Sequence, residues 1–305
     1  MGKIAFVFSG QGDQYAGMGR SLSERYPAAA RVFAACDRLR PGTSAQCFAG
    51  SEEELKETKN TQPCLFAYEL ALAAVLEEQG VRADLTAGFS LGEVAALTYA
   101  GAVEPDTGFS LVCRRGELMQ EAAEAYPASM AAVVKLPPEE VSRIAAGFDR
   151  VYPVNFNSPG QVSVAGEESS MAAFCAAVKE AGGRAIPLRV KGGFHSPFMD
   201  GASERFAQVL GETAFAAPRI PLYSDVTAQP YGEDFAGLLA KQIRSPVLWE
   251  RLVRNMIAEG TDTFVEIGPG KTLCGLISRI EPSVRALAAC GLEQSETILD
   301  EVKTC

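Results

Sequence analysis

The stretch TAGFSLGEVAALTYAG, residues 86–101, decides the fold, because it joins a short strand to a helix through the pattern G-x-S-x-G. Residues 86–89 are typical of a brief strand, and residues 91–100 of a helix that ends at Gly101. A serine in such a sharp turn projects its hydroxyl away from the sheet. The helix N-terminus behind it offers backbone N–H groups to a developing oxyanion. The pattern favours Ser90 as a nucleophile, and the alternative is a glycine-flanked turn in which Ser90 only caps the helix.

Further strands and helices alternate on both sides of this motif, which is typical of an α/β fold. The elements that we assign to this part are strands at residues 3–8, 221–224 and 263–267 and helices at residues 63–79, 235–243 and 247–259. We therefore expect a large α/β-hydrolase-like catalytic subdomain with a parallel sheet. It is discontinuous, and consists of residues 1–125 and 191–305.

The middle of the chain has a different pattern. We assign strands to residues 130–136, 151–156, 161–165 and 184–190 and helices to residues 137–148 and 167–181. The resulting order β-α-β-β-α-β is that of the ferredoxin-like fold. The sequence therefore predicts an inserted ferredoxin-like subdomain over residues 126–190.

The chain contains a single histidine, His195. A serine hydroxyl becomes a good nucleophile only when a base removes its proton, so by the usual route His195 is the base for Ser90. It lies in the sequence GGFHSP, residues 192–197, and loops on a rigid scaffold commonly carry catalytic groups. The alternative is an ordinary surface or core histidine, because a lone histidine does not by itself indicate a site.

The composition argues against several other classes of function. With 47% hydrophobic and 22% charged residues, the 305-residue chain is typical of a globular protein. Its 28 basic and 38 acidic side chains give a net charge of −10, which argues against general nucleic-acid binding. The eight cysteines contain no CxxC pair, so they indicate neither a zinc site nor a redox motif, and a reducing, cytoplasmic compartment suits them. We identify no secretory signal and no membrane-spanning stretch, and expect no membrane role.

Two glycine-rich patterns are incomplete nucleotide-binding motifs. Gly10 and Gly12 follow a strand as in G-x-G-x-x-G, but Tyr15 stands where the third glycine belongs. The sequence GKT at residues 270–272 resembles the end of a phosphate-binding loop, but Val265 stands at the position of its first glycine. We therefore expect no nucleotide site at either place.

Several other motifs occur together in a fixed order. They are FSGQGDQ (8–14), GFSLGE (88–93), RG and MQ (115–116 and 119–120), NFNSPGQ (155–161), FHS (194–196) and EIGPG (266–270). In order and spacing these motifs resemble those of malonyl-CoA:acyl carrier protein transacylases, a family of free-standing fatty acid enzymes and of acyltransferase domains from polyketide synthases. The resemblance extends from residue 3 to residue 292.

The resemblance implies a ping-pong transfer. Ser90 attacks the malonyl thioester of coenzyme A with His195 as general base, and CoA leaves. The phosphopantetheine thiol of an acyl carrier protein then attacks the malonyl-serine ester. Malonyl-CoA is the substrate, and neither a cofactor nor a metal is implied. We expect a transient, acidic carrier protein as partner, no nucleic acid or membrane, and a monomeric enzyme of fatty acid or polyketide biosynthesis.

The resemblance also implies roles for five supporting residues. The backbone N–H groups of Gln11 and Leu91 form the oxyanion hole. The guanidinium of Arg115 binds the malonyl carboxylate through its planar fork, although the sequence without the resemblance indicates only a solvated helix charge. The backbone carbonyl of Gln242 orients the histidine, and Asn157 is a polar residue near the site.

Two phenylalanines bear on the choice of acyl group. Most family members have histidine directly before the nucleophile, where this chain has Phe89. That histidine is not the base in the family, so we expect activity to survive. The position lines the pocket, so the sequence leaves open how Phe89 affects acyl preference. Phe194 resembles the malonyl-selective form of its motif, because a ring beside C2 of the acyl group crowds an added methyl. A pocket discriminates one methyl by only about 1–3 kcal/mol, so we expect a preference.

Two other functions are compatible with these motifs. One is an acyl-thioester hydrolase (editing) on the same fold, and the other is a non-catalytic module that binds carrier proteins. Intact Ser90, His195 and Arg115 argue against the module. Arg115 also argues against the hydrolase, since an enzyme that clears varied acyl groups needs no carboxylate clamp.

An acidic carrier is not attracted by a chain with a net charge of −10, so docking requires a local basic patch. The candidates are Arg184, Arg189, Lys191, Lys271 and Arg279. The alternative is that these are scattered, solvated charges.

Overall fold

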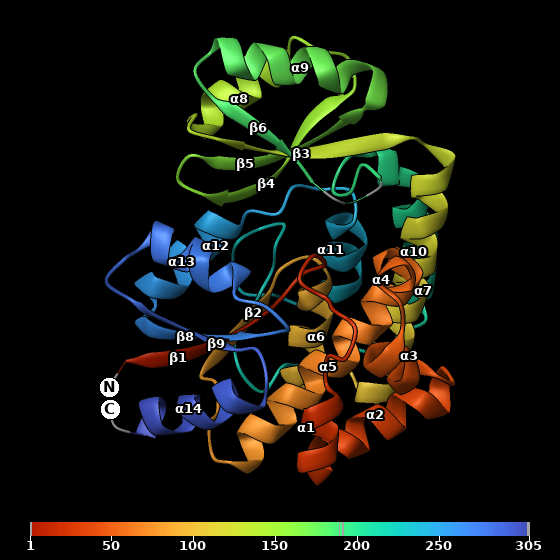
Figure 1. Ribbon diagram of the computed structural model, residues 1–305, viewed down its shortest axis with the longest axis vertical. Helices are drawn as coiled ribbons and strands as arrows, with labels where there is room; N and C mark the ends of the chain where they lie inside the picture. The colour runs from red at the N-terminus through yellow and green to blue at the C-terminus, as the bar shows by residue number, and fades with distance from the viewer. Residues whose placement is uncertain (1, 189, 191, 304–305) are drawn as a thin grey trace.

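Two β-sheets organise the chain in the computed structural model, which describes residues 2–188, 190 and 192–303 (Figure 1). The larger sheet has the strand order β7-β2-β1-β8-β9, and every neighbouring pair is parallel. Its strands are β1 (Lys3–Phe8), β2 (Leu85–Gly88), β7 (Leu222–Tyr223), β8 (Thr261–Ile267) and β9 (Arg285–Ala289). The predicted α/β class with a parallel sheet is confirmed.

The central strand β1 is apolar on both faces, as a strand must be when helices cover both sides of a parallel sheet. Phe6 and Phe8 point into the core on one side, and Ala5 and Val7 into the core on the other. All four are fully buried. The short apolar run at the start of the chain therefore becomes the middle of the sheet.

Helices cover the two faces of this sheet. The helices whose buried side chains share the Phe6 side are α1 (Arg20–Arg25), α2 (Pro27–Leu39), α3 (Thr43–Ala49), α4 (Glu52–Lys56), α5 (Thr58–Glu78), α6 (Leu91–Tyr99), α7 (Pro105–Ala125), α10 (Asp200–Gly211), α11 (Phe235–Gln242) and α14 (Leu292–Lys303). On the Val7 side lie α12 (Trp249–Ala258) and α13 (Thr272–Ile280). None of the helices within the described residues is long and apolar enough to cross a membrane.

The smaller sheet is antiparallel and lies at the top of Figure 1. Its strands β3 (Ala128–Val134), β4 (Val151–Ser158), β5 (Gln161–Glu167) and β6 (Arg184–Pro187) have the order β4-β5-β3-β6, and α8 (Pro138–Ala145) and α9 (Glu168–Glu180) pack on one face. This is the β-α-β-β-α-β unit expected from the sequence. The strands lie within residues 126–190, and the exact subdomain boundaries remain a prediction.

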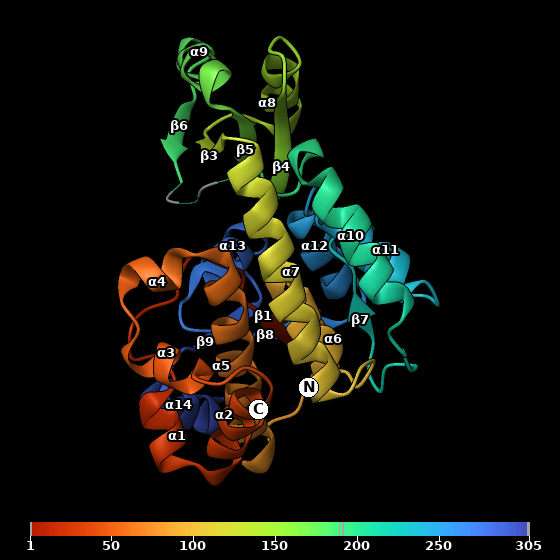
Figure 2. The same cartoon turned by 90° about the vertical axis from the view of Figure 1, so that its right-hand side faces the viewer.

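Some predicted boundaries differ from the structure. The helix expected from residue 63 is α5, which begins at Thr58 and contains Pro63 in its interior. Pro63 therefore does not begin the helix, because the first turn already forms where Thr61 N donates to Glu57 O over 2.8 Å. Helix α7 is absent from the sequence analysis, yet it runs up to the small subdomain and leads into β3 (Figure 2).

The carboxyl ends of β1 and β2 lie side by side, and the turns that follow them are in close contact. A Cβ atom on Gly92 would lie 2.2 Å from Phe8 O and 2.5 Å from Ser9 O. Glycine is thus required at the second glycine of the G-x-S-x-G motif, since both clashing atoms belong to the backbone.

We expect Gly92→Ala to lower the free energy of unfolding by about 1–3 kcal/mol or more, because the added methyl forces the two turns apart. Urea titration followed by circular dichroism measures this change. The control is Gly275→Ala in α13, where a Cβ meets no atom within 4 Å. That variant should be neutral or stabilised by up to about 1 kcal/mol. Equal effects in the two variants would contradict the steric argument.

Candidate active site

Ser90 lies in the turn between β2 and α6, with backbone angles φ 56° and ψ −105°. A non-glycine residue rarely adopts positive φ, and such strain persists only where the surroundings hold it. Here both backbone groups of the serine are held. Ser90 N donates to Asp225 Oδ2 over 2.7 Å, and Gln242 Nε2 donates to Ser90 O over 2.6 Å. The turn therefore presents the hydroxyl in one fixed direction.

His195 meets this hydroxyl, as the sequence predicts. Its Nε2 lies 2.7 Å from Ser90 Oγ, and its Nδ1 lies 2.9 Å from the backbone oxygen of Gln242. A carbonyl oxygen only accepts, so Nδ1 carries the hydrogen and Nε2 is free to accept the serine proton. The predicted position of the Gln242 carbonyl against the histidine is thus observed.

His195 is only 4% exposed. Burial, followed by the nearby positive charge of Arg115, lowers the pKa of His195 to about 4. The ring is therefore neutral at physiological pH, which is the form that accepts a proton. In chemical terms the pair is a serine with a ready general base.

Arg115 lies in α7 and is 1% exposed, so the interpretation of this residue as a solvated helix charge is wrong. Its Nη2 donates to Gln242 Oε1 over 2.7 Å and lies 3.3 Å from Ser90 Oγ. Its Nε and Nη1 are buried without a partner in the part of the chain that the structure describes. Burial lowers the pKa of Arg115 to about 10, against the opposing effect of Glu93 and Asp225, so the guanidinium stays charged. The guanidinium therefore places a positive charge beside Ser90, where it can attract an anion.

Two buried carboxyl groups near Ser90 have no role assigned to them in the sequence analysis. Glu93 lies one turn into α6, and Asp225 follows β7. Both are fully buried and hydrogen-bonded to Gln242. For Glu93 a signal existed, since an acidic residue interrupts an otherwise apolar helix whose nine residues are all buried. Nothing in the local sequence distinguishes Asp225.

The two residues predicted to form the oxyanion hole also lie at this point. Gln11 and Leu91 line the same cavity as Ser90, and within the described residues their backbone N–H groups have no hydrogen-bond partner. The turn that carries Gln11 is fixed at its start, because Ser9 Oγ donates to the buried Glu69 Oε1 over 2.7 Å. Two free N–H donors on adjacent turns can stabilise a developing negative charge on an oxygen.

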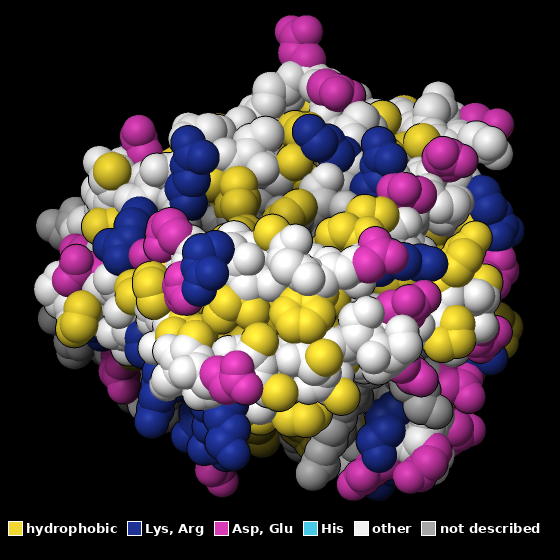
Figure 3. Space-filling view, turned by 90° about the horizontal axis from the view of Figure 1, so that it is seen from above, with side chains coloured by type: hydrophobic (Ala, Val, Ile, Leu, Met, Phe, Trp, Pro, Cys, Tyr) yellow, Lys and Arg dark blue, Asp and Glu magenta, His cyan; other side chains and the backbone are white. Residues whose placement is uncertain are grey.

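The cavity above Ser90 has a volume of about 230 Å³ and lies between the two subdomains. Asn155, Asn157, Met130, Ala132, Phe89, Phe194 and Gln62 are among its lining residues. Figure 3 looks onto the small-subdomain end, where hydrophobic side chains gather in the middle of the face and charged side chains surround them. The polar Asn157 is itself held, since its Nδ2 donates to Ser163 Oγ over 3.1 Å.

Phe89, the residue in place of the usual histidine, forms part of the cavity wall. Its ring packs edge-to-face against Trp249 of α12, with the centroids 5.4 Å apart. Trp249 is fully buried. An aromatic pair therefore supports the wall directly beside the nucleophile.

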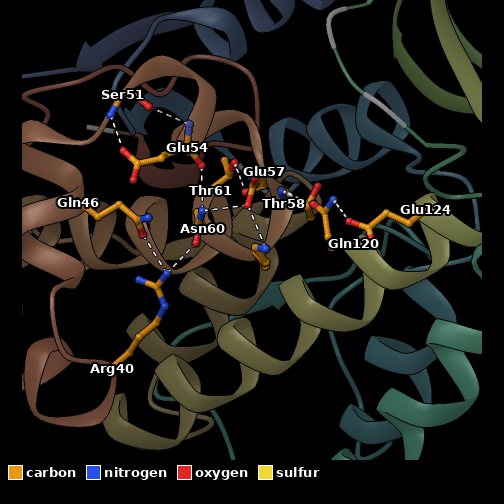
Figure 4. Close-up of polar contacts among 11 residues, drawn as sticks. Arg40, Gln46, Ser51, Glu54, Glu57, Thr58, Asn60, Thr61, Gln120 and Glu124 are labelled. Carbon is orange, nitrogen blue, oxygen red and sulfur yellow. Dashed lines mark hydrogen bonds and ion pairs between the residues drawn. The ribbon is translucent and has the colours of Figure 1, made fainter.

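The wall formed by α5 and α7 is tied together by polar contacts (Figure 4). Thr58 N, at the start of α5, donates to Gln120 Oε1 of α7 over 2.8 Å. Arg40 Nη2 donates to Asn60 Oδ1 over 2.8 Å and so ties α2 to the same turn. These bonds fix the relative position of the helices that carry Gln62 and Arg115.

Three of the five candidate carrier-docking residues lie within the described chain. Arg184 is exposed on β6, and Lys271 is exposed directly before α13. Arg279 Nη1 donates to Gln161 Oε1 over 2.6 Å, so it joins α13 to the small subdomain. Arg189 and Lys191 lie outside the described residues.

The described residues contain no group of three or more His, Cys, Asp or Glu side chains that could hold a metal ion.

Comparison with known proteins identifies close relatives. A family model described as acyl transferase domain matches residues 5–288. The chain is 38% identical to the malonyl CoA-acyl carrier protein transacylase of Bacillus subtilis, over 99% of this chain and 98% of that protein. It is also 38% identical to the transacylase of the same name from Escherichia coli K12, over 94% and 96% of the two chains.

Solved structures show the same fold. The malonyl CoA-acyl carrier protein transacylase from Clostridium perfringens superposes with a TM-score of 0.95 and 34% identity, covering 99% of this chain and 98% of that one. A second structure contains a malonyl-transacylase in complex with its type II PKS acyl-carrier protein. It has a TM-score of 0.94 and 35% identity, with 98% and 99% of the chains covered.

The lowered pKa of His195 predicts the acid limb of the reaction. We expect kcat/KM for acylation of Ser90 by a thioester to fall only as the pH approaches about 4, since that profile reports the free enzyme. Stopped-flow measurement of thiol release from the thioester between pH 4 and 8 tests this. In Arg115→Ala the repelling charge is gone, so the pKa of His195 rises and the limb shifts to higher pH. An acid limb in the native enzyme near 6.5, the ordinary histidine value, would contradict the assignment.

Proposed function

The chain belongs to the malonyl-CoA:acyl carrier protein transacylases, a family of acyltransferases, and on that premise we propose that Ser90 carries the malonyl group between the two substrates. The observation that supports this most directly is that His195 Nε2 and Arg115 Nη2 both lie within 3.3 Å of Ser90 Oγ. A nucleophile, a base and a cation for the substrate carboxylate are the three groups that malonyl transfer requires.

In the first half-reaction Ser90 Oγ attacks the thioester carbonyl while its proton passes to His195 Nε2. The carbonyl oxygen becomes an oxyanion between the N–H groups of Gln11 and Leu91. Collapse of this intermediate breaks the carbon–sulfur bond, and the CoA thiolate takes the proton back from His195. The products are CoA and a malonyl-serine ester.

Arg115 positions the substrate in this step. Its Nη1 and Nη2 form the end-on fork of parallel donors that a carboxylate can accept from, and a bidentate pair of this kind fixes orientation as well as charge. Gln242 accepts one hydrogen bond from Nη2, so the guanidinium is already oriented before substrate binds. An acetyl group lacks this carboxylate and gains nothing from the clamp.

In the second half-reaction the thiol of a phosphopantetheine arm accepts the malonyl group. In a hydrolase, water would be the acceptor. His195 takes the thiol proton, the thiolate attacks the ester carbonyl, and Ser90 Oγ recovers a proton as it leaves. The relative solved together with its acyl-carrier protein supports a carrier protein as the donor of that thiol. The carboxylate clamp favours transfer over general thioester hydrolysis, as the sequence indicates.

The walls of the cavity set the acyl preference. Phe194 is 8% exposed and borders the space above Ser90, so a methyl branch at C2 of the acyl group meets its ring. Phe89, another lining residue, is an apolar ring where most family members have a polar one. We propose a malonyl preference that arises from attraction by Arg115 and crowding by Phe194.

The covalent intermediate is the first test of this proposal. Malonyl-CoA alone should add one malonyl mass to the peptide that contains Ser90, because the chain needs no acceptor for the first half-reaction. Ser90→Ala should remove the adduct, and adding holo carrier protein to the native adduct should move the mass to the carrier. Mass spectrometry of digested protein and intact carrier measures both steps. An adduct on a cysteine, or loss of malonate to water with no carrier labelling, would overturn the mechanism.

The carboxylate clamp is tested by Arg115→Ala. Loss of two charge-assisted hydrogen bonds should lower kcat/KM for malonyl-CoA by about 100-fold or more, with a much smaller change for acetyl-CoA. The matched control is Arg114→Ala, since Arg114 is a half-buried arginine on the same helix that pairs with Glu117. An unchanged malonyl-to-acetyl ratio in Arg115→Ala would show that this residue is not the clamp.

A further inference from the structure

The carboxyl groups of Glu93 and Asp225 meet directly below the nucleophile, although the two residues come from α6 and from the segment after β7. Both side chains are 0% exposed. Asp225 N donates to Glu93 Oε1 over 3.3 Å, and the same amide nitrogen, Gln242 Nε2, lies 2.7 Å from Glu93 Oε2 and 3.2 Å from Asp225 Oδ2. Two ionised carboxylates this close together in a buried site repel each other, which favours a proton on one of them.

Glu93 is surrounded by donors. Its Oε1 accepts from the Tyr231 hydroxyl and from Asp225 N, and its Oε2 accepts from Gln242 Nε2 over 2.7 Å. A carboxyl group with this many incoming hydrogen bonds is satisfied as a carboxylate. A proton on either of its oxygens would point at another hydrogen.

Asp225 has the opposite arrangement. Its Oδ2 accepts from Ser90 N over 2.7 Å and from Gln242 Nε2 over 3.2 Å. Its Oδ1 is buried, and within the described residues nothing donates to it. A buried charged oxygen without a donor is costly, whereas a protonated Oδ1 is neutral and can itself donate to an ionised Glu93.

The charges around Glu93 and Asp225 favour a pair in which one of the two carboxyl groups is protonated. Arg115 is the cation that faces it, His195 is neutral, and the Tyr231 hydroxyl donates to Glu93. Burial, followed by the charge of Glu93, raises the pKa of Asp225 well above its ordinary value. One guanidinium, one carboxylate and one neutral acid together carry no net charge, which a fully buried cluster favours.

We propose that Asp225 is protonated on Oδ1 and donates to an ionised Glu93, and that this acid–carboxylate pair is the positioning element that keeps Ser90 in its strained conformation. The pair acts on both sides of the serine. Asp225 Oδ2 holds Ser90 N–H, and Glu93 orients the Gln242 amide that holds the Ser90 carbonyl. The effect on acylation rests on the proposed function, whereas the location of the proton does not.

The pair predicts opposite outcomes for two isosteric variants. In Asp225→Asn the amide oxygen can accept from Ser90 N–H and the amide nitrogen can donate to Glu93, so every bond of the protonated acid is reproduced. In Glu93→Gln the new NH₂ group faces Gln242 Nε2, Asp225 N or the Tyr231 hydroxyl, all of which already donate. Asp225→Ala removes the bond to Ser90 N–H altogether.

Infrared difference spectroscopy tests the proton without reference to activity. The spectrum of the native enzyme minus that of Asp225→Asn at pH 8 should contain the carbonyl stretch of a protonated carboxylic acid, shifted in D₂O. The control is Asp106→Asn, since Asp106 is exposed on the first turn of α7, and its difference spectrum should contain only carboxylate bands. A carboxylate band alone for Asp225→Asn would overturn the proposal, whether or not malonyl transfer occurs.

Acylation kinetics test the positioning role. The rate of CoA release in a single turnover should stay within about threefold of native in Asp225→Asn, and fall by about 10- to 100-fold in Glu93→Gln and Asp225→Ala. Melting temperatures identify any variant that has lost its fold. If Glu93→Gln is such a variant, the comparison of Asp225→Asn with Asp225→Ala alone tests the positioning role. Equal losses in those two variants would show that Asp225 acts through a negative charge, and an unimpaired Glu93→Gln would place the proton on Glu93. If the native enzyme releases no CoA, the proposed function fails while the infrared result stands.

Discussion

The backbone conformation of Ser90 is the constraint on which the site depends. At φ 56° and ψ −105° the residue bears strain of about 1–3 kcal/mol. The strain persists because the serine N–H and carbonyl are both bound to buried side chains that come from distant parts of the chain. The glycines on either side, Gly88 and Gly92, pack against neighbouring backbone, so the turn has no room for another conformation. Sheet order, turn contacts and buried polar groups all serve to keep one hydroxyl in place.

Much of the fold follows from local sequence. The strand predicted at residues 3–8 is β1, and the mirrored half-pattern in the middle of the chain is the small antiparallel sheet. These predictions succeed because apolar runs between glycine turns have few other solutions. Helix α7 is different, since its buried face includes Gly108, Arg115 and Gly116 and therefore lacks a clear apolar stripe.

The site residues also divide into those that the local sequence identifies and those that it does not. Ser90 and His195 can be identified from a motif and from the presence of a single histidine, and the structure brings them to 2.7 Å. Arg115 is indicated only by resemblance, because a buried arginine and a solvated one look alike in sequence. The contact between Asp225 and Glu93 joins residues 132 positions apart, and such a contact becomes visible only when the chain is folded. Long-range polar partnership is the part of this enzyme that no local pattern encodes.

The aromatic contact beside the nucleophile has a practical consequence. Trp249 is the single tryptophan of the chain, and its indole lies against the ring of Phe89, which borders the cavity. All indole emission of the protein therefore originates one side chain away from the reacting serine. The enzyme carries a built-in optical reporter, through which the arrival and departure of an acyl group can be followed in real time without any added label.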